Sequence, residues 1–311
     1  MDSSRTEGST AVRVSAEPAW EKEKTNMDQI KTKVVKINEA YRNMREKELS
    51  FSLEDRNRPA KLTDGDRAVL REAADVLRRG GLAAFPTETV YGLGANALDE
   101  KAAKKIYEAK GRPSDNPLIA HIADLDGLKP LVSEIPEAGR KLAEAFWPGP
   151  LTLVFPKSEI VPRGTTGGLE TVAVRMPSDP VARELIRLAG VPIAAPSANT
   201  SRRPSPTRAE HVLQDMDGKI DMIVDGGPVG IGVESTIVDV TEDIPTLLRP
   251  GAITMEMLRS VVGQAAVDPA ITGPMRADVK PKAPGMKYRH YAPKASLTLV
   301  EGDTEAVTAR I

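Results

Sequence analysis

Short apolar runs alternate with longer amphipathic runs over residues 63–263, and this alternation restricts the fold more than any other feature. Short apolar runs are typical of buried strands, whereas apolar residues at intervals of three and four are typical of helices that cover a sheet. Two or three of the short runs follow one another without a helix between them. The order predicts an α/β domain on a mixed twisted open sheet flanked by helices, and not a strictly doubly wound sheet.

The individual elements follow from the same pattern. The expected strands lie at residues 32–37, 82–85, 117–122, 151–155, 171–176, 192–196, 220–225, 234–240 and 246–250. The expected helices lie at residues 62–81, 99–110, 136–146, 179–190, 207–216 and 253–263. The segment 62–81 has an acidic first turn and ends at Gly80 and Gly81, as helix boundaries commonly do.

The two ends of the chain lack this alternation. Residues 1–27 are polar and aperiodic and predict a disordered tail, because they offer too little apolar surface to offset the entropy of ordering. Residues 28–62 form an N-terminal extension with one short expected strand and no other definite fold. Residues 264–295 are rich in proline and glycine and predict a linker or a functional lid. Residues 296–311 predict the start of a truncated second domain.

Composition excludes several classes of site. The 43 Lys and Arg residues nearly balance the 44 Asp and Glu residues, so a formal charge of −1 gives no global attraction to nucleic acid or anionic lipid. The chain has no cysteine and only 3 histidines, which are far apart, so disulfides, thiolate chemistry and a histidine-rich metal centre are not expected. No apolar run is long enough to span a membrane and no signal peptide is visible, which predicts a cytoplasmic protein.

The segment 85–94 (FPTETVYGLG) places hydroxyl groups at alternating positions, on Thr87, Thr89 and Tyr91, directly after an expected strand. Alternate residues of an extended chain face the same side, so several of these hydroxyls are able to face one ligand. A threonine-rich loop also forms hydrogen bonds with its own backbone, and the segment alone does not distinguish the two interpretations.

The segment 110–122 (KGRPSDNPLIAHI) carries two cations, Lys110 and Arg112, on a loop restricted by glycine and proline. A lysine point charge, an arginine fork and the amide of Asn116 suit a polyphosphate at the surface of a cleft. For a generic pair of this kind, solvated cations near a helix C-terminus are the alternative. His121 lies in an apolar run, where a histidine usually belongs to the core.

Three further segments predict polar groups at the ends of strands. Arg175 ends the apolar run TVAV, which is costly unless its guanidinium meets a carboxylate or lies at the mouth of a cleft. Ser197 and Asn199 follow another strand, on a loop of small residues that permits close approach of a ligand. Ser235 opens one strand and Arg249 closes the next.

These motifs occur in the order and approximate spacing of the YrdC-like threonylcarbamoyl-AMP synthases, which the chain resembles over about residues 63–263. The matching segments are PTETVYGLG, KGRPSDNPLIAHI, WPGPLTLVF, VAVRMP, PSAN, VESTIVD and LLRPG. The linker sequence KYRHYAP resembles the two-domain members, whose smaller C-terminal domain is Rossmann-like. The resemblance implies synthesis of L-threonylcarbamoyladenylate from L-threonine, bicarbonate and ATP, with release of pyrophosphate, for the threonylcarbamoyladenosine modification of tRNA.

The resemblance also implies roles for individual residues. The expected catalytic set is Lys110, Arg112, Ser197 and Asn199. The residues expected to hold ATP are Arg112, Asn116, Thr171, Ser197, Ser205, Arg249 and Tyr291, the last of these closing over the site from the linker. The residues expected to hold L-threonine are Thr89, His121, Arg175, Ala195 through its backbone, and Ser235. Magnesium is expected to accompany ATP, without a metal site built by the protein, and the product is expected to pass to a tRNA threonylcarbamoyl transferase.

The implied chemistry agrees with the residue types. Several anions share one site, and two like charges about 4 Å apart repel by roughly 4 kcal/mol at an effective dielectric of 20, so fixed cations are required. The chain has no P-loop and no evident nucleophile with its base. Attack by a bound carbamate on the α-phosphate of ATP, catalysed by positioning and electrostatics, is the more economical mechanism.

Two other functions remain open at this point. One is an RNA-binding module that uses a basic cleft, which the balanced charge and the 4% content of aromatic residues disfavour. The other is a related carbamoyl-transferring or adenylate-forming enzyme on the same fold. An amino-acid screen for ATP-dependent release of pyrophosphate separates these functions.

Overall fold

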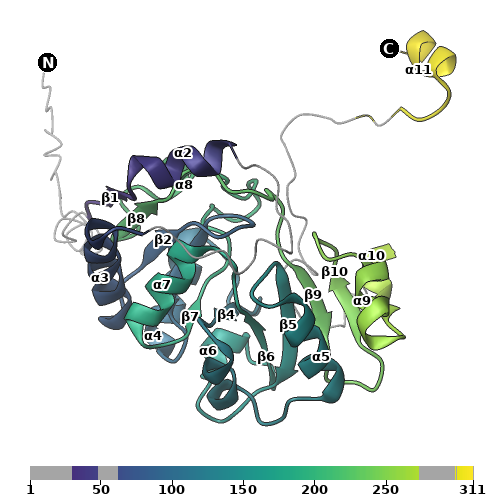
Figure 1. Cartoon of the computed structure of the whole chain (residues 1–311), viewed down its shortest axis with the longest axis horizontal. Coiled ribbons are helices and arrows are strands. Elements are labelled where there is room, and N and C mark those ends of the chain that lie inside the picture. The colour runs from purple at the N-terminus through teal and green to yellow at the C-terminus, as the bar shows by residue number, and fades with distance from the viewer. Residues whose placement is uncertain (1–29, 48–61, 273–297, 299, 311) are drawn as a thin grey trace, which may run out of the picture. The chain divides into compact units, whose positions relative to one another are not determined.

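The computed structural model describes residues 30–47, 62–272, 298 and 300–310, and its main feature is an 11-stranded sheet (Figure 1). The strands lie in the order β1-β8-β2-β3-β7-β4-β6-β5-β9-β10-β11. Their bounds are β1 Lys33–Lys36, β2 Ala83–Phe85, β3 Gly92–Asn96, β4 Ile119–His121, β5 Leu151–Pro156, β6 Thr171–Arg175, β7 Ile193–Ala194, β8 Met222–Asp225, β9 Thr236–Asp239, β10 Thr246–Arg249 and β11 Ala266–Val267. Parallel pairs such as β4 with β6 adjoin antiparallel pairs such as β5 with β6, so the expected mixed sheet is confirmed.

The helices alternate with the strands along most of the chain. Their bounds are α2 Glu39–Lys47, α3 Asp64–Arg78, α4 Glu100–Lys110, α5 Glu137–Phe146, α6 Arg163–Thr166, α7 Pro180–Ala189, α8 Ala209–Met216, α9 Met255–Val262, α10 Pro269–Thr272 and α11 Thr304–Arg310, with 3-10 turns η3 Leu125–Gly127 and η4 Lys129–Leu131. Within the described ranges, no helix combines the length and the apolar character needed to cross a membrane.

The two ends of α4 show how local sequence sets a boundary that matters for the site. The Asp99 carboxylate accepts hydrogen bonds from the backbone N–H groups of Lys101 and Ala102, which satisfies donors that a helix start leaves open. At the other end Gly111 adopts φ 59°, a left-handed conformation that favours glycine. The chain therefore reverses directly after Lys110.

Helices cover both faces of the first half of the sheet. Successive residues of β2 and β8 face opposite sides: Ala84 and Ile223 belong to one apolar cluster, whereas Ala83 and Val224 belong to a second. The first cluster includes side chains from α4, α5, α8 and α9, and the second includes side chains from α2, α3 and α7. Figure 1 shows α3 and α7 side by side, and the two helices contact each other.

A third apolar cluster contains only strand residues. Its members are Ile119, Val154, Ala173, Ile237 and Leu248, from β4, β5, β6, β9 and β10. Because residues two apart on a strand share a face, polar residues two positions away in these strands lie on the same side as the cluster. This face, opposite to α5 and α9, is where the structure brings several expected site residues together.

Every strand and helix expected between residues 62 and 263 is present, but one strand was not expected. β3 begins within the segment 85–94, whose glycines lower strand propensity, and extends to Asn96. A Cβ atom on Gly94 would lie 2.8 Å from the Phe85 ring and 3.0 Å from the Ala83 carbonyl oxygen. The close approach of β2 to β3 therefore requires glycine at this position.

The C-terminal segments differ in part from expectation. Residues 264–272, assigned to a linker from their composition, form β11, which pairs with β10, and α10. Their single proline, Pro269, is the first residue of α10, where a missing N–H costs little. The rest of the expected linker and the tail 1–27 lie outside the described residues, as do residues 296, 297, 299 and 311 of the expected second domain. α11 is described, and the Rossmann-like domain stays a prediction.

The N-terminal extension joins the domain through β1 and α2. β1 pairs in parallel with β8, which confirms the strand expected at residues 32–37. α2 was not expected, and its Arg45 donates hydrogen bonds to the carbonyls of Pro228 (2.8 Å) and Thr87 (3.1 Å) and pairs with the buried Asp179. The extension therefore contacts the backbone of the segment 85–94.

Candidate active site

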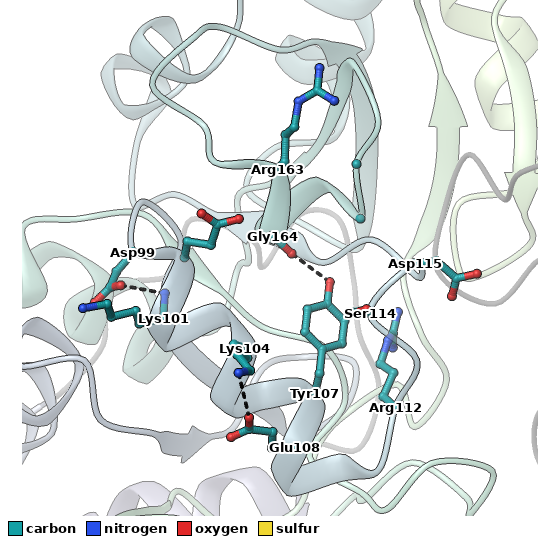
Figure 2. A pocket seen from close by; sticks show the side chains of 13 residues that line it. Asp99, Lys101, Lys104, Tyr107, Glu108, Arg112, Ser114, Asp115, Arg163 and Gly164 are labelled. Atoms are coloured by element: carbon teal, nitrogen blue, oxygen red, sulfur yellow. Dashed lines mark hydrogen bonds and ion pairs between the residues drawn. The ribbon is translucent and has the colours of Figure 1, made fainter.

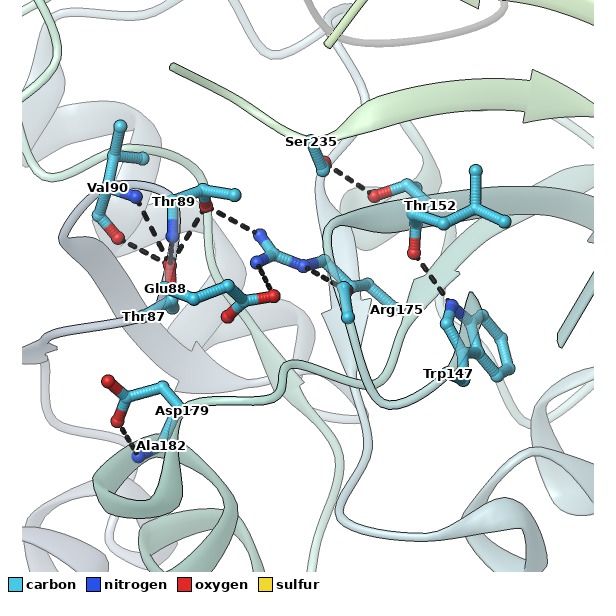
Figure 3. A network of polar contacts seen from close by, with 12 residues as sticks. Thr87, Glu88, Thr89, Val90, Trp147, Thr152, Arg175, Asp179, Ala182 and Ser235 are labelled. Atoms are coloured by element: carbon cyan, nitrogen blue, oxygen red, sulfur yellow. Dashed lines mark hydrogen bonds and ion pairs between the residues drawn. The ribbon is translucent and has the colours of Figure 1, made fainter. Parts of the chain in front are cut away.

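Four polar side chains form a row across neighbouring strands, on the face that carries Ile119 and Ala173. We call the set His121, Arg175, Thr152 and Ser235 the polar row. His121 of β4 and Thr152 of β5 both lie directly opposite Arg175 of β6. The Thr152 hydroxyl lies 2.7 Å from the Ser235 hydroxyl, just before β9 (Figure 3). All four residues are buried.

Arg175 is the centre of the network in Figure 3. Its Nη1 donates to the Thr89 hydroxyl (3.0 Å), and its Nε donates to the Gly149 carbonyl (3.3 Å). Its Nη2 lies 2.7 Å from the Glu88 carboxylate, and both side chains are more than nine-tenths buried. Of the two alternatives expected for this guanidinium, the structure shows the contact with a carboxylate, although Glu88 itself was not among the expected site residues.

The three hydroxyl groups of the segment 85–94 do not all contact the polar row. Thr87 accepts hydrogen bonds from the backbone N–H groups of Thr89 and Val90 and donates to the Val90 carbonyl (2.7 Å). Tyr91 is fully buried and donates to the carbonyl of Gly227 (2.6 Å). The expectation of a shared face is therefore wrong for Tyr91, because its large ring packs in the core. Thr89 alone of the three contacts Arg175.

His121 is held neutral by its surroundings. Its Nδ1 lies 3.0 Å from the Ile119 carbonyl oxygen. Burial, followed by the Arg175 guanidinium, lowers the pKa of His121 to about 3, although the carbonyls of Ile119 and Ile193 partly oppose this change. An uncharged imidazole beside Arg175 adds no second positive charge, so Arg175 carries the positive charge of the polar row.

Substituting His121 should change how the stability of the protein depends on pH. Below its ordinary pKa of 6.5 the unfolded chain protonates this histidine while the folded chain does not, so the free energy of unfolding falls as the pH falls. From pH 6.5 to pH 5 the loss is roughly 2 kcal/mol. Urea unfolding at pH 7 and pH 5 should show that His121→Asn removes this loss. The exposed His211→Asn is the control, and an equal pH dependence in wild type and His121→Asn would contradict the prediction.

Lys110 lies inside the protein, and the expectation that it lines the surface of a cleft is wrong. It is 2% exposed, and its Nζ donates to the carbonyls of Ser197 and Asn199, the latter at 2.5 Å. Burial, followed by the charge of Arg112, lowers the pKa of Lys110 well below its ordinary value. Through these two hydrogen bonds Lys110 anchors the loop of the PSAN motif, residues 196–199.

The PSAN loop also pairs with the segment 85–94. Ser197 forms an isolated antiparallel β-bridge with Gly92. On either side of it, the Leu93 N–H donates to the Pro196 carbonyl (2.7 Å), and the Ala198 N–H donates to the Tyr91 carbonyl (2.8 Å). The segment 85–94 therefore contacts Arg175 through Thr89 and the PSAN loop through its backbone. These contacts bring three of the expected motifs into one site.

Two further expected residues reach the polar row from its β9 end. The Arg249 guanidinium donates to the Ser235 carbonyl through Nε (3.0 Å) and Nη2 (2.9 Å). The Ser205 hydroxyl donates to the carboxylate of Glu234, the residue before Ser235. Both placements agree with the expectation that these residues share a site with Ser235.

The remaining expected residues lie less close to the row. The Arg112 guanidinium donates to the carbonyl of Pro117 (2.9 Å), and Asn116 is buried with no hydrogen-bond partner for its Oδ1 among the described residues. The Ala195 N–H donates to the Ile119 carbonyl (2.9 Å), so only its carbonyl is left for a ligand. Thr171 shares the face of Arg175, roughly 13 Å along β6. Tyr291 lies outside the described residues.

Glu88 and Thr152 are the functional candidates that sequence reasoning missed. Thr152 was detectable in principle, because it alternates with core residues on an expected strand. Glu88 gave a weaker signal: it is the single carboxylate in a segment where hydroxyl groups drew attention. Its partner Arg175 is distant in sequence, so only the fold brings the two together.

A separate open groove of about 1180 Å³ lies along α4 (Figure 2). Its lining residues are Asp99, Glu100, Lys101, Lys104, Tyr107, Glu108, Arg112, Ser114, Asp115, Arg163, Gly164, Gly167 and Gly168. Arg112 is the only expected site residue in this set. The acidic and basic side chains of the groove balance, and Arg163 pairs with Glu170, so the groove does not concentrate charge for a polyphosphate. The polar row is the better candidate.

Comparison with known proteins agrees with this geometry. A family model described as "Telomere recombination" (Sua5, YciO and YrdC) matches residues 75–251, and one described as "Threonylcarbamoyl-AMP synthase, C-terminal domain" matches residues 253–310. A threonylcarbamoyl-AMP synthase of Pyrococcus abyssi is 59% identical over 242 residues, which cover 78% of this chain and 71% of that protein. One of Bacillus subtilis is 56% identical over 239 residues, which cover 76% of this chain and 68% of that protein.

A solved structure leads to the same family. The crystal structure of P. abyssi Sua5 complexed with L-threonine matches with a TM-score of 0.76 and 56% identity. The match covers 81% of this chain and 72% of that one. The order of the motifs, the shared fold and the extent of identity agree, and the chain belongs to the threonylcarbamoyl-AMP synthase family.

Proposed function

We propose that the chain condenses L-threonine, bicarbonate and ATP into L-threonylcarbamoyladenylate and releases pyrophosphate. The observation that carries the proposal is the polar row, in which a buried arginine and a neutral histidine lie side by side at the ends of strands. Such a row offers a fixed positive charge to a carboxylate and hydrogen-bonding groups to a hydroxyl. Support also comes from the family, whose named members make this adenylate.

L-Threonine is assigned to the polar row. Its carboxylate is held by Arg175, while Thr89, His121, Ser235 and the carbonyl of Ala195 surround the rest of the molecule. Arg175 suits this role because hydrogen bonds to Thr89 and Gly149 already fix its guanidinium. A guanidinium fixed in this way loses little entropy when it binds a carboxylate.

ATP and bicarbonate are assigned to the side of the site that carries the PSAN loop. The proposed ATP-binding residues are Arg112, Asn116, Thr171, Ser197, Ser205, Arg249 and Tyr291. The proposed catalytic set is Lys110, Arg112, Ser197 and Asn199. In this set the buried Lys110 holds the carbonyls of Ser197 and Asn199, so it positions the loop. Arg112 supplies charge to the phosphates.

Magnesium belongs to the proposal as the escort of the triphosphate. Mg²⁺ usually binds through one or two carboxylates together with phosphate oxygens and water. Among the described residues no group of three or more His, Asp or Glu side chains could hold a metal ion, so phosphate oxygens and water would be its main ligands. The ion would neutralise phosphate charge. The product would pass to a tRNA threonylcarbamoyl transferase.

An amino-acid screen tests the proposed function. Release of pyrophosphate from ATP is measured in the presence of bicarbonate and each of the twenty amino acids in turn. L-Threonine should give the largest rate, and omission of bicarbonate should lower it strongly. Serine lacks one methyl group and should bind more weakly by about 1 kcal/mol. Pyrophosphate release that does not depend on any amino acid would overturn the proposal.

A further inference from the structure

The Glu88 carboxylate has capacity for hydrogen bonds that the protein does not use. Its Oε1 lies 2.7 Å from Arg175 Nη2, yet the approach does not meet hydrogen-bond geometry. Among the described residues, both carboxylate oxygens and Arg175 Nη2 have no hydrogen-bond partner. Buried polar atoms in this state cost about 1–3 kcal/mol each, so their presence calls for an explanation.

A ligand with two opposite charges would satisfy these atoms. An α-amino acid carries its carboxylate and its ammonium group on one carbon atom, so the two charges are adjacent. Arg175 Nη2 is a donor for the carboxylate, and the two Glu88 oxygens are acceptors for the ammonium group. Arg175 alone would accept any carboxylate, whereas Arg175 beside Glu88 selects a zwitterion.

The backbone that carries Glu88 is well fixed. The Glu88 carbonyl accepts a hydrogen bond from the Ile231 N–H (2.9 Å), and the preceding Thr87 accepts two from the turn that follows it. Arg45 of α2 donates to the Thr87 carbonyl (3.1 Å). A carboxylate on such a turn keeps its place beside the fixed Arg175 guanidinium when a substrate binds.

We propose that Glu88 binds the α-ammonium group of the amino-acid substrate and removes a proton from it. The proposal rests on the proposed function and adds a residue to it. A protonated amine has no lone pair and cannot attack bicarbonate, so some group must take this proton before a carbamate forms. Glu88 lies next to Arg175, which holds the substrate carboxylate. The amine is attached to the carbon atom beside that carboxylate.

The step balances without any further reactant. The N–H bond of the ammonium group breaks, and the proton forms an O–H bond on Glu88. The lone pair of the amine forms an N–C bond with the carbon atom of bicarbonate. The C–OH bond of bicarbonate then breaks, and the leaving hydroxide takes a second proton from the nitrogen and departs as water. Glu88 returns its proton to solvent, so the products are a carbamate, water and one proton.

Binding measurements test the recognition of the ammonium group. Calorimetry without ATP compares L-threonine with 3-hydroxybutyrate, which keeps the carboxylate and hydroxyl groups of threonine and lacks the amine. Wild type should prefer threonine at least tenfold, and Glu88→Gln should lose most of this preference. Glu144→Gln makes the same change at an exposed residue and should keep it. An unchanged preference in Glu88→Gln would overturn the proposal, whereas wild type that does not bind threonine would overturn the proposed function.

The pH profile tests the proton transfer. Glu88→Gln should lower kcat at pH 7 by roughly 10²- to 10⁴-fold, as expected for loss of a general base. Its rate should then rise about tenfold per pH unit, because only threonine with a free amine reacts. Glu88→Asp keeps a carboxylate and should restore the flatter wild-type profile at a lower rate. If Glu88→Gln keeps the wild-type profile, Glu88 only positions Arg175 and the proposal fails.

Discussion

Replacing Lys110 with methionine should lower kcat by about 10²- to 10³-fold, the size of effect seen when a fixed hydrogen-bond donor is removed from an active site. Methionine has a similar length and no charge, so the carbonyls of Ser197 and Asn199 lose the donor that holds them. The loop that carries two of the proposed catalytic residues then loses its anchor. The net cost in stability should be about 2 kcal/mol, which lowers Tm by roughly 4–8 °C.

Lys105→Met is a matched control, because Lys105 lies on the same helix and donates to a single carbonyl, that of Gly80 (2.7 Å). It should cost some stability and leave kcat within about twofold of wild type. Steady-state release of pyrophosphate and circular dichroism are measured on both variants. Full activity of Lys110→Met would remove Lys110 from the proposed set. A collapsed circular dichroism spectrum would show that its role is structural.

The sheet was predictable because its strands are short apolar runs and its helices have one apolar face. The end of β6 illustrates how far such reasoning reaches into the site. A buried arginine at the end of an apolar strand is costly, and this cost predicted either a carboxylate beside Arg175 or a place for it at the mouth of a cleft. The sequence did not identify Glu88 as that carboxylate, because no local rule links a strand end to a turn so distant in the chain.

The position of Lys110 shows where local rules fail. A lysine in the last turn of a helix is normally solvated and interacts with the helix dipole, which is what the sequence indicated. In the fold, the PSAN loop lies against this turn and encloses the ammonium group with backbone carbonyls. Backbone carbonyls leave no signature in the sequence, so the burial of Lys110 depends on tertiary structure alone.

The N-terminal extension was unpredictable for a related reason. α2 is short and highly charged, and without tertiary contacts a helix of nine residues is marginal in water. Its stability comes from Arg45, which pairs with Asp179 and donates to backbone carbonyls of the domain, and from the buried ring of Tyr41. These partners lie far away in the sequence, so the periodicity of the segment did not indicate them.

Replacing Arg175 with lysine should raise the KM for L-threonine by roughly 30- to 150-fold, which corresponds to about 2–3 kcal/mol. Lysine keeps the positive charge but has no planar fork. Its single ammonium group cannot reproduce both hydrogen bonds of Arg175, to the Thr89 hydroxyl and the Gly149 carbonyl, together with the ion pair to Glu88. The substrate carboxylate would therefore meet a mobile point charge. The KM for ATP should change by less than about twofold, because the proposed ATP-binding residues are intact.

Release of pyrophosphate is measured while L-threonine is varied at saturating ATP, and then while ATP is varied at saturating L-threonine. Arg183→Lys is the control: Arg183 is partly buried on α7, and its Nε donates to the Ala123 carbonyl (3.3 Å), outside the polar row. It should leave both KM values unchanged. An unchanged KM for L-threonine in Arg175→Lys would show that this arginine does not hold the substrate carboxylate. If both KM values rise together and Tm falls, the substitution has disturbed the sheet between β4 and β5, and the assignment loses its support.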